Sequence, residues 1–183
     1  ILESNKTFED IANHWAKLYV ESMVAKNVIH GYSDETFRPN DEITRAEFVV
    51  MMINGLETEL VGYKDQFTDV SADEWYADYI ATIKELGFAK GYGDGTFRPN
   101  DKITRTEAAV MLSNIIDIEL SEKEIDTLLA QFTDKDDIAA WAVEDIAKVV
   151  KAKVMEGNNG KFLSNENTTR AEVATIIYRI YNR

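Results

Sequence analysis

The residues best suited to chemistry in this chain of 183 residues are three arginines, each inside a Thr-Arg-x-Glu motif. The motifs occupy residues 44–47, 104–107 and 169–172. A threonine followed three residues later by a glutamate is a capping box: the threonine accepts from the amide at N3, and the glutamate reaches back to the cap. Each motif therefore predicts the start of a helix that has arginine at its first position.

Helix propensity does not explain these arginines, because a cation at a helix N-terminus opposes the macrodipole by roughly 0.3–1 kcal/mol at exposed sites. A short linker helix predicted at residues 121–129 has the same kind of box but carries Glu122 at that position. A guanidinium beside free backbone N–H groups can bind a carboxylate or phosphate in bidentate fashion. Arg45, Arg105 and Arg170 are therefore candidate anion-binding residues.

A structural role for the same arginines stays open at this stage. The chain has 33 acidic residues, so each arginine can instead pair with a carboxylate of a neighbouring repeat and set the register of the fold. That alternative predicts arginines that matter for assembly rather than for ligand binding.

A loop element recurs with the motifs, which identifies tandem repeats. Residues 31–41 read GYSDETFRPND and residues 91–101 read GYGDGTFRPND, whereas the third copy at 157–165 is one residue shorter before its Phe and lacks the Tyr and the Arg-Pro. We predict repeats at 1–60, 61–120 and 121–183, the last including the linker helix, in one cooperative unit.

The hydrophobic pattern predicts two helices in each repeat. Trp15, Leu18, Tyr19 and Met23 follow the spacing of an amphipathic helix, while the helices after the Thr-Arg-x-Glu motifs are apolar nearly all round. Three such helices are most simply buried against one another. The expected fold is all-α: a pseudo-threefold helical bundle with ordered loops and with grooves between neighbouring repeats.

The tryptophans and loop residues supply further candidates. Trp15, Trp75 and Trp141 can stack on sugar rings, although at the start of amphipathic helices we expect core anchors. Tyr32 and Tyr92 can project a hydroxyl into a groove. The side chains of Phe37, Phe97 and Phe162 are expected to fill the core beneath the loops.

Charge near the loops favours the first two repeats as ligand sites. His30 and Lys90 precede the loop glycine in those repeats and suit an anion, whereas Glu156 in the third opposes one. Asp34 and Asp94 are expected to be turn residues, with ligand hydroxyls as their alternative partners.

Composition narrows the functional classes. The net charge of −13 argues against sequence-independent nucleic-acid binding, which needs clustered Lys and Arg. No cysteines are present, which excludes disulfides and thiolate metal sites, and no stretch approaches 18 consecutive apolar residues, so no membrane insertion is expected. The first residues lack a signal-peptide pattern, and a leader removed before them would leave the same start.

Taken together, Phe-x-Asp, a Trp-containing helix, Gly-Tyr-x-Asp-Gly-Thr-Phe-Arg-Pro-Asn and Ile-Thr-Arg-x-Glu resemble the S-layer homology family, three repeats of which span nearly the whole chain. The resemblance implies a secreted, cell-surface module that anchors an S-layer or exported protein to the wall. It also implies a secondary cell-wall polysaccharide bearing pyruvylated N-acetylmannosamine as the partner, and an arginine that recognises the pyruvate carboxylate. By motif position these are Arg45, Arg105 and Arg170, with Asn13 as a weaker groove candidate. Any S-layer lattice would form through the parent protein.

Two alternatives to this interpretation remain. A glycoside hydrolase needs a pair of carboxylates, but the sequence singles out none, and His14 and His30 are the only histidines. We therefore expect no catalysis, no cofactor and no metal site, since the acidic stretches do not follow the calcium-loop pattern. A protein–protein assembly module with structural arginines is the second alternative.

Overall fold

The computed structural model describes residues 7–183. The α-helices in that part are α1 (Lys17–Ala25), α2 (Arg45–Gly55), α3 (Ala77–Glu85), α4 (Arg105–Ser113), α5 (Glu122–Leu129), α6 (Val143–Lys151) and α7 (Arg170–Tyr181). The short 3-10 helices are η1 (Glu9–Ile11), η2 (Lys135–Asp137) and η3 (Ala140–Ala142). Isolated bridges replace regular strands throughout these residues. The all-α prediction is confirmed.

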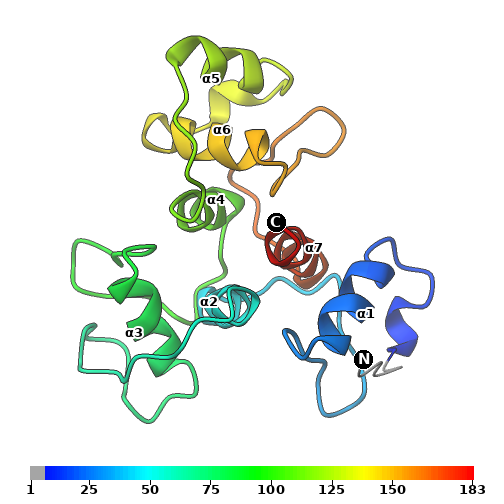
Figure 1. Ribbon diagram of the computed structural model, residues 1–183, viewed down its shortest axis with the longest axis vertical. Coiled ribbons are helices and arrows are strands. Elements are labelled where there is room, and N and C mark those ends of the chain that lie inside the picture. Colours follow the sequence, from blue (N-terminus) through cyan, green and yellow to red (C-terminus); the bar gives the residue numbers. More distant parts are fainter. Residues whose placement is uncertain (1–6) are drawn as a thin grey trace.

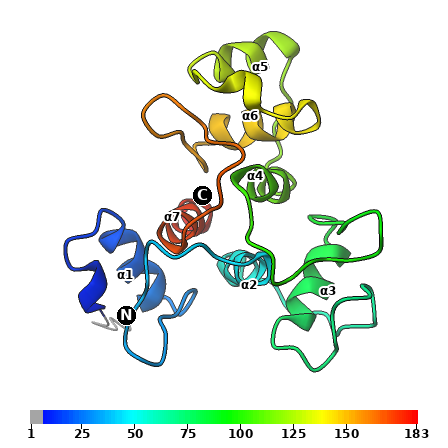
Figure 2. The same cartoon turned by 180° about the vertical axis from the view of Figure 1, so that it is seen from behind.

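Helices α2, α4 and α7 lie around the centre of the molecule, and α1, α3 and α6 lie in three outer lobes (Figure 1). Seen from behind, the same three central helices surround the axis (Figure 2). The central helices are buried on most sides, as their apolar sequences predicted. This arrangement is the expected pseudo-threefold bundle.

Each outer helix packs on the central helix of the preceding repeat, and the N-terminal repeat closes the ring. Helix α3 packs on α2 and α6 packs on α4, while α1 packs on α7 at the other end of the chain. A repeat in the sequence is therefore not a separate packing unit. Each lobe packs on a central helix from a different repeat.

Backbone hydrogen bonds at the centre form a closed triangle just before the threonine caps. The amide of Ile43 donates to Thr168 O at 3.1 Å, Thr168 N donates to Ile103 O at 2.9 Å, and Ile103 N donates to Ile43 O at 3.2 Å. Because each residue both donates and accepts, the triangle is complete only when all three repeats are in place. It fixes where the three central helices begin.

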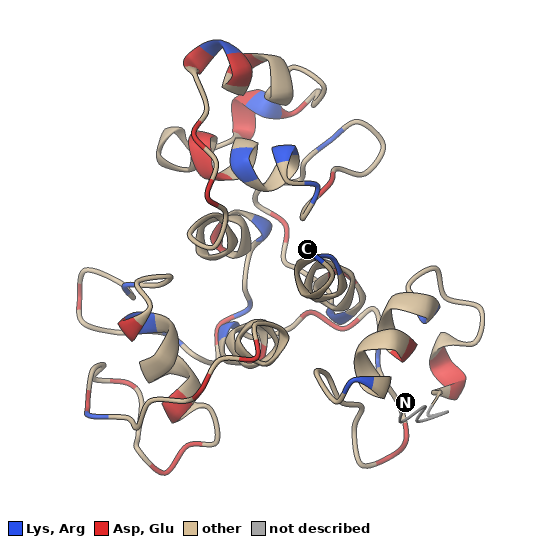
Figure 3. Cartoon of the chain, viewed as in Figure 1, with Lys and Arg blue, Asp and Glu red and all other residues tan. Residues whose placement is uncertain are grey.

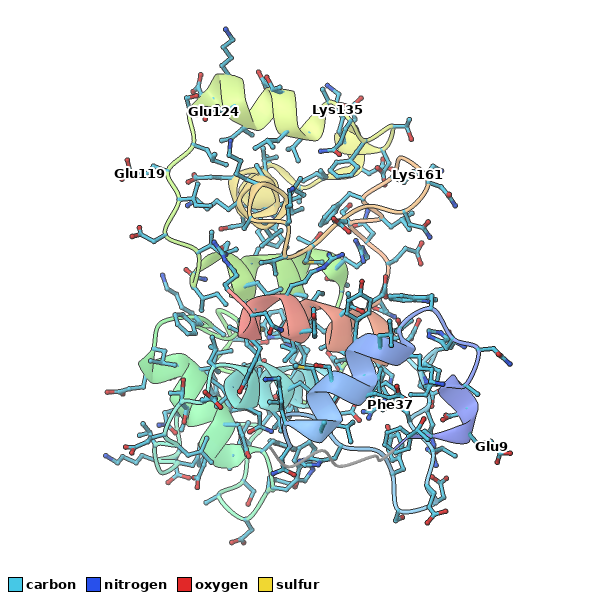
Figure 4. The ribbon with its side chains drawn as sticks, turned by 45° about the vertical axis from the view of Figure 1, so that its right-hand side comes forward. Glu9, Phe37, Glu119, Glu124, Lys135 and Lys161 are labelled. Carbon is cyan, nitrogen blue, oxygen red and sulfur yellow. The ribbon has the colours of Figure 1, made fainter. Side chains whose placement is uncertain are left out.

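A pair of phenylalanines fills the interior of each loop, as predicted for Phe37, Phe97 and Phe162. The ring centroids of Phe8 and Phe37 are 5.7 Å apart, and Figure 4 shows Phe37 inside the lobe beside α1, with Glu9 at its edge. The carboxylate of Asp10 accepts from the amides of Phe37 and Arg38. The other repeats use Asp69 with Phe97 and Arg98, and Asp134 with Phe162 and Leu163.

The predicted buried face of the first helix is only partly right. Helix α1 begins at Lys17, and Met23 is buried as predicted, but Leu18 is 77% exposed, and Ala16 and Val20 are buried instead. Helix α3 likewise begins at Ala77. The buried stripe starts at the residue after each tryptophan, because the tryptophan lies in the turn that leads into the helix.

The linker helix is confirmed as α5. Ser121 caps it, and its side chain accepts from Glu124 N in a complete capping box. The helix lies at the outside of the third lobe, with Glu124 in its first turn (Figure 4). It gives that lobe a layer that the other two lack (Figure 1).

Gly91 should not tolerate a side chain. Its φ is +72°, and a Cβ there would lie 2.3 Å from a ring carbon of Phe67 and 2.7 Å from Thr96 O. We expect Gly91→Ala to lower the free energy of unfolding by roughly 1–3 kcal/mol, measured by urea denaturation, because both backbone strain and overpacking oppose it. Gly93 in the same loop has open space around it, so Gly93→Ala is the matched control. Equal effects of the two changes would contradict this account.

Candidate functional site

The three arginines begin α2, α4 and α7, and the predicted capping boxes are all present. Each guanidinium is nonetheless almost fully buried, since Arg45, Arg105 and Arg170 are only 4%, 5% and 7% exposed. Buried arginines require acceptors for their N–H groups. Those acceptors come from the following repeat.

Arg45 shows the contact pattern. Its Nε donates to Phe97 O at 3.0 Å, and its Nη1 donates to Glu107 Oε1 at 3.0 Å. Glu107 is the capping-box glutamate of α4, so the ion pair links the starts of two central helices. Equivalent contacts join Arg105 to Phe162 O and Glu172, and Arg170 to Phe37 O and, at 3.9 Å, Glu47.

The expectation of free backbone N–H groups at these helix starts is wrong. The amide of Arg45 donates to Asp101 O at 2.9 Å, and that of Ala46 donates to Pro99 O at 3.0 Å. The corresponding donors are the amides of Arg105 and Thr106, which bind the carbonyls of Glu166 and Ser164, and those of Arg170 and Ala171, which bind Asp41 and Pro39. Carbonyls of the next repeat thus occupy the places that an anion would take. Only the guanidinium remains available to a ligand.

Arg45 differs from the other two arginines at its Nη2 nitrogen. Arg105 Nη2 donates to Glu156 O at 2.7 Å, and Arg170 Nη2 donates to His30 O at 2.9 Å. Among residues 7–183, Nη2 of Arg45 has no protein acceptor. Arg45 therefore keeps an uncommitted donor group.

Arg45 lines a groove of about 370 Å³, here called the Arg45 groove. Its walls combine the loop and the central helix of repeat two with one residue of repeat one and two of repeat three. They include Lys90, Tyr92, Glu107, Val110, Met111, Asn114, Trp141 and Asp145.

A second groove, of about 520 Å³, contains Arg105 and is called the Arg105 groove. Its loop and central helix come from repeat three, and its tryptophan comes from repeat one. Its lining includes Trp15, Asn40, Glu156, Asn158, Glu172, Thr175 and Arg179. Each groove therefore draws on all three repeats.

This construction changes which loop serves which arginine. Lys90 and Tyr92 face Arg45, whereas Arg105 faces Glu156 of the degenerate third loop. Tyr32 lies against Arg170, whose Cζ is 4.6 Å from the ring centroid. The sequence-based ranking that put Arg105 above Arg170 assumed that each arginine uses the loop of its own repeat, and this assumption is wrong.

The expectation that the tryptophans are core anchors is also wrong. Trp15, Trp75 and Trp141 are 60%, 60% and 67% exposed. Trp15 lines the Arg105 groove and Trp141 lines the Arg45 groove. Trp75 precedes α3, which packs on α2, so the pseudo-threefold relation places it at the corresponding position near Arg170. An exposed indole at a groove wall suits stacking on a sugar face.

The loop tyrosines bind the glutamates that pair with the arginines. Tyr92 donates its hydroxyl to Glu107 Oε1 at 2.5 Å, and Tyr32 donates to Glu47 Oε1 at 3.4 Å. Burial raises the pKa of Tyr32. Burial, together with the hydrogen bond to Glu107, raises the pKa of Tyr92 to about 12. Both phenols are therefore hydrogen-bond donors at neutral pH.

Asp34 and Asp94 are turn residues, in line with the first expectation for them. Asp34 accepts from Thr36 Oγ1 at 2.6 Å and pairs with Arg38 at 2.8 Å, and Asp94 repeats both contacts with its own loop. These bonds lower the pKa of each carboxyl to about 2. Neither aspartate lines the Arg45 or Arg105 groove, and neither does Asn13, which is exposed.

Sequence reasoning did not assign several groove residues. Asn40, Asp145 and Arg179 all line a groove. Asn40 and Asp145 line grooves whose loop and central helix belong to another repeat, so spacing within a repeat gives no indication of them. Arg179 pairs with Glu156 of its own repeat, 23 residues away, which local spacing does not indicate either.

The geometry fits what comparison with known proteins shows. The family model of the S-layer homology domain matches residues 7–49, 66–109 and 131–174. The chain belongs to the S-layer homology family. Membership places it among modules of bacterial surface proteins, and no helix in the described part is long and apolar enough to cross a membrane.

Several larger proteins contain a similar segment. An amylopullulanase of Thermoanaerobacterium thermosulfurigenes is 34% identical over 99% of this chain and 10% of its own length. A surface-layer 125 kDa protein of Lysinibacillus sphaericus is 36% identical over 90% of this chain and 14% of its own length. A cellulosome-anchoring protein of Acetivibrio thermocellus is 34% identical over 80% of this chain and 33% of its own length. This S-layer homology chain thus spans a third or less of each of these relatives.

The environment of Tyr92 predicts that its phenol ionises at a higher pH than a free tyrosine. Its folded-state pKa of about 12 lies above the usual value of 10.0, so the stabilisation that it contributes is complete below pH 10 and is lost as pH rises towards 12. In an ultraviolet titration of phenolate, the difference between the native protein and Tyr92→Phe should rise near pH 12. A difference that rises near pH 10 in protein that is still folded would contradict the Tyr92–Glu107 contact.

Proposed function

We propose that this chain is a non-catalytic module that anchors a bacterial surface protein to the cell wall. The family supports this role, as do relatives named as surface-layer and cellulosome-anchoring proteins. Other relatives are named as polysaccharide-degrading enzymes, of which the chain matches only a small part. A shared accessory segment in proteins with such different names fits anchoring better than catalysis.

The carboxylates of the Arg45 groove also support a non-catalytic role. Glu107 accepts from both Arg45 and Tyr92, and Asp145 accepts from Ser113 Oγ at 2.5 Å. A general acid or base must exchange protons with a substrate, and these carboxylates are already occupied by structural donors. Acidic and basic segments both occur in each of the three lobes (Figure 3).

The proposed ligand is a cell-wall polysaccharide that carries an acidic sugar, specifically pyruvylated N-acetylmannosamine. The Arg45 groove carries this proposal, because it combines the uncommitted Nη2 of Arg45 with Lys90 and with the exposed face of Trp141. Phe97 O and Glu107 hold the guanidinium in place from one side. Nη2 can then donate to a carboxylate while the indole stacks on the sugar ring.

Arg170 is proposed as a weaker contact for a carboxylate of this kind, because its Nη2 already donates to His30 O, while its Nη1 has only the 3.9 Å ion pair with Glu47. Arg105 donates from all three of its side-chain nitrogens to protein acceptors, so an anion gains least from it. His30, Tyr32 and Trp75 would serve the Arg170 position. The proposed complex has no ligand contact with Asp34, Asp94 or Asn13.

Long-range electrostatics oppose binding, since a chain of net charge −13 repels an acidic polymer. Attraction must come from short-range contacts inside the grooves. Added salt weakens the pairing with Arg45 and Lys90 but also screens the repulsion, so the net salt dependence should be modest.

We predict that affinity for a pyruvylated N-acetylmannosamine disaccharide depends on the cations of the Arg45 groove. Arg45→Lys keeps the charge but removes the planar donor pair, so affinity should fall by about tenfold. Lys90→Met should weaken binding by about threefold, because an exposed ion pair contributes modestly. Isothermal titration calorimetry measures both, and thermal melting checks that each variant remains folded.

Lys123→Met is the matched control, because it removes the same charge from the exposed outer face of α5 and should leave affinity unchanged. A disaccharide without the pyruvate should bind at least about tenfold more weakly to the native protein. Equal binding of the two sugars would overturn the proposed recognition. Failure of both to bind a folded protein would favour the assembly alternative, in which the paired arginines act only between repeats.

A further inference from the structure

Two positions give the grooves different charge. One is the residue before the loop glycine, and the other lies nine residues after the arginine that begins each central helix. In repeats one to three these positions hold His30 and Asn54, Lys90 and Asn114, and Glu156 and Arg179. The third repeat has therefore placed an anion on the loop and a cation on the helix.

The helix residue occupies the same place in every repeat. Asn54 Nδ2 donates to Val28 O, Asn114 Nδ2 donates to Phe88 O, and Arg179 Nη1 donates to Val154 O, each at 3.3 Å. These acceptors are equivalent loop positions. Arg179 keeps this bond and uses its second nitrogen, Nη2, to pair with Glu156 Oε2 at 2.5 Å.

As a result, every cation in the Arg105 groove is already paired. Arg105 donates from Nε, Nη1 and Nη2 to Phe162 O, Glu172 and Glu156 O, and both terminal nitrogens of Arg179 have acceptors. In the Arg45 groove, by contrast, neither Lys90 nor Nη2 of Arg45 has an acceptor within residues 7–183. An anion entering the Arg105 groove would meet Glu156 and would have to break an existing ion pair.

The remaining lining of the Arg105 groove suits hydroxyl and acetamido groups. Asn40, Asn158 and Thr175 supply uncharged polar side chains, and Trp15 supplies an aromatic face that is 60% exposed. The volume of about 520 Å³ exceeds that of the Arg45 groove. Neutral hydrogen-bonding groups around an exposed aromatic face match an uncharged sugar ring.

We propose that the Arg105 groove binds an uncharged N-acetylated sugar, and that the Glu156–Arg179 ion pair sets this specificity. The inference rests on the proposed function, because the uncharged sugar would belong to the same wall polysaccharide whose acidic sugar binds at Arg45. The module would then recognise two chemically different sugars of one polymer.

The tryptophans allow the two grooves to be observed separately, since Trp15 lines the Arg105 groove and Trp141 lines the Arg45 groove. We would titrate 15N-labelled native protein with an N-acetylmannosamine disaccharide, with and without pyruvate, and follow the indole N–H signals. Single Trp→Phe variants assign the signals. The Trp15 signal should give affinities for the two sugars within about threefold, and the Trp141 signal should favour the pyruvylated sugar by at least about tenfold.

An exchange of the two charge arrangements tests the ion pair itself. The double change Glu156→Lys with Arg179→Asn installs the residues of the Arg45 groove, and should raise the preference of the Trp15 signal for the pyruvylated sugar to about tenfold. The reverse change, Lys90→Glu with Asn114→Arg, should abolish the preference at Trp141. Each double variant changes one groove, so the indole signal of the unchanged groove is its internal control.

The outcomes separate this inference from the proposed function. If the Trp15 signal in the native protein prefers the pyruvylated sugar as strongly as Trp141 does, or responds to neither sugar, the inference is wrong whether or not the double variants fold. If Trp141 shows no preference for the pyruvylated sugar, the proposed function fails instead. A neutral-sugar response at Trp15 would in that case still support an uncharged site.

Discussion

The structure depends on a cyclic exchange of hydrogen bonds in which each repeat satisfies the helix start of the repeat before it. Ile43, Ile103 and Thr168 bind one another in a closed triangle, and the first two amides of each central helix donate to carbonyls of the next loop. These N–H groups are the ones a helix leaves unpaired, and burying them without partners would be costly. No repeat can therefore complete its own central helix, and the ring closes only when α1 packs on α7.

This exchange explains why arginine occupies a position that the helix dipole disfavours. Carbonyl oxygens of the next repeat lie at the helix start, and the guanidinium of Arg45 gains a further carbonyl and the carboxylate of Glu107. The structural and ligand-binding interpretations of the arginine are thus compatible. The contacts with the next repeat use Nε and Nη1 and hold the side chain at the floor of a groove, where Nη2 of Arg45 is left for a ligand.

The sequence predicted features that are decided within a few residues. The capping boxes, the linker helix and the buried Phe37, Phe97 and Phe162 were all correct, because local hydrogen bonding and apolar character determine them. The sequence-based predictions failed where the contact partner of a residue lies in another repeat. Loop charge favoured the second repeat as a ligand site, although the cyclic packing places Arg105 against Glu156 of the third loop. The tryptophans were misassigned because helix spacing alone does not distinguish a buried stripe from one that begins a residue later.

Building each groove from three repeats also changes how the degenerate third loop should be understood. The third loop lacks the Tyr and carries Glu156. These changes leave the surroundings of Arg170 unaltered, because that arginine lies against Tyr32 of the first repeat. The altered residues act on the arginine of repeat two. Arg179 compensates for Glu156 while keeping the backbone contact that Asn54 and Asn114 make elsewhere, so the groove changes its charge arrangement without losing its framework. A ring of interlocked repeats can therefore diversify its binding sites one loop at a time, since a loop makes its scaffold contacts through backbone carbonyls and its ligand contacts through side chains.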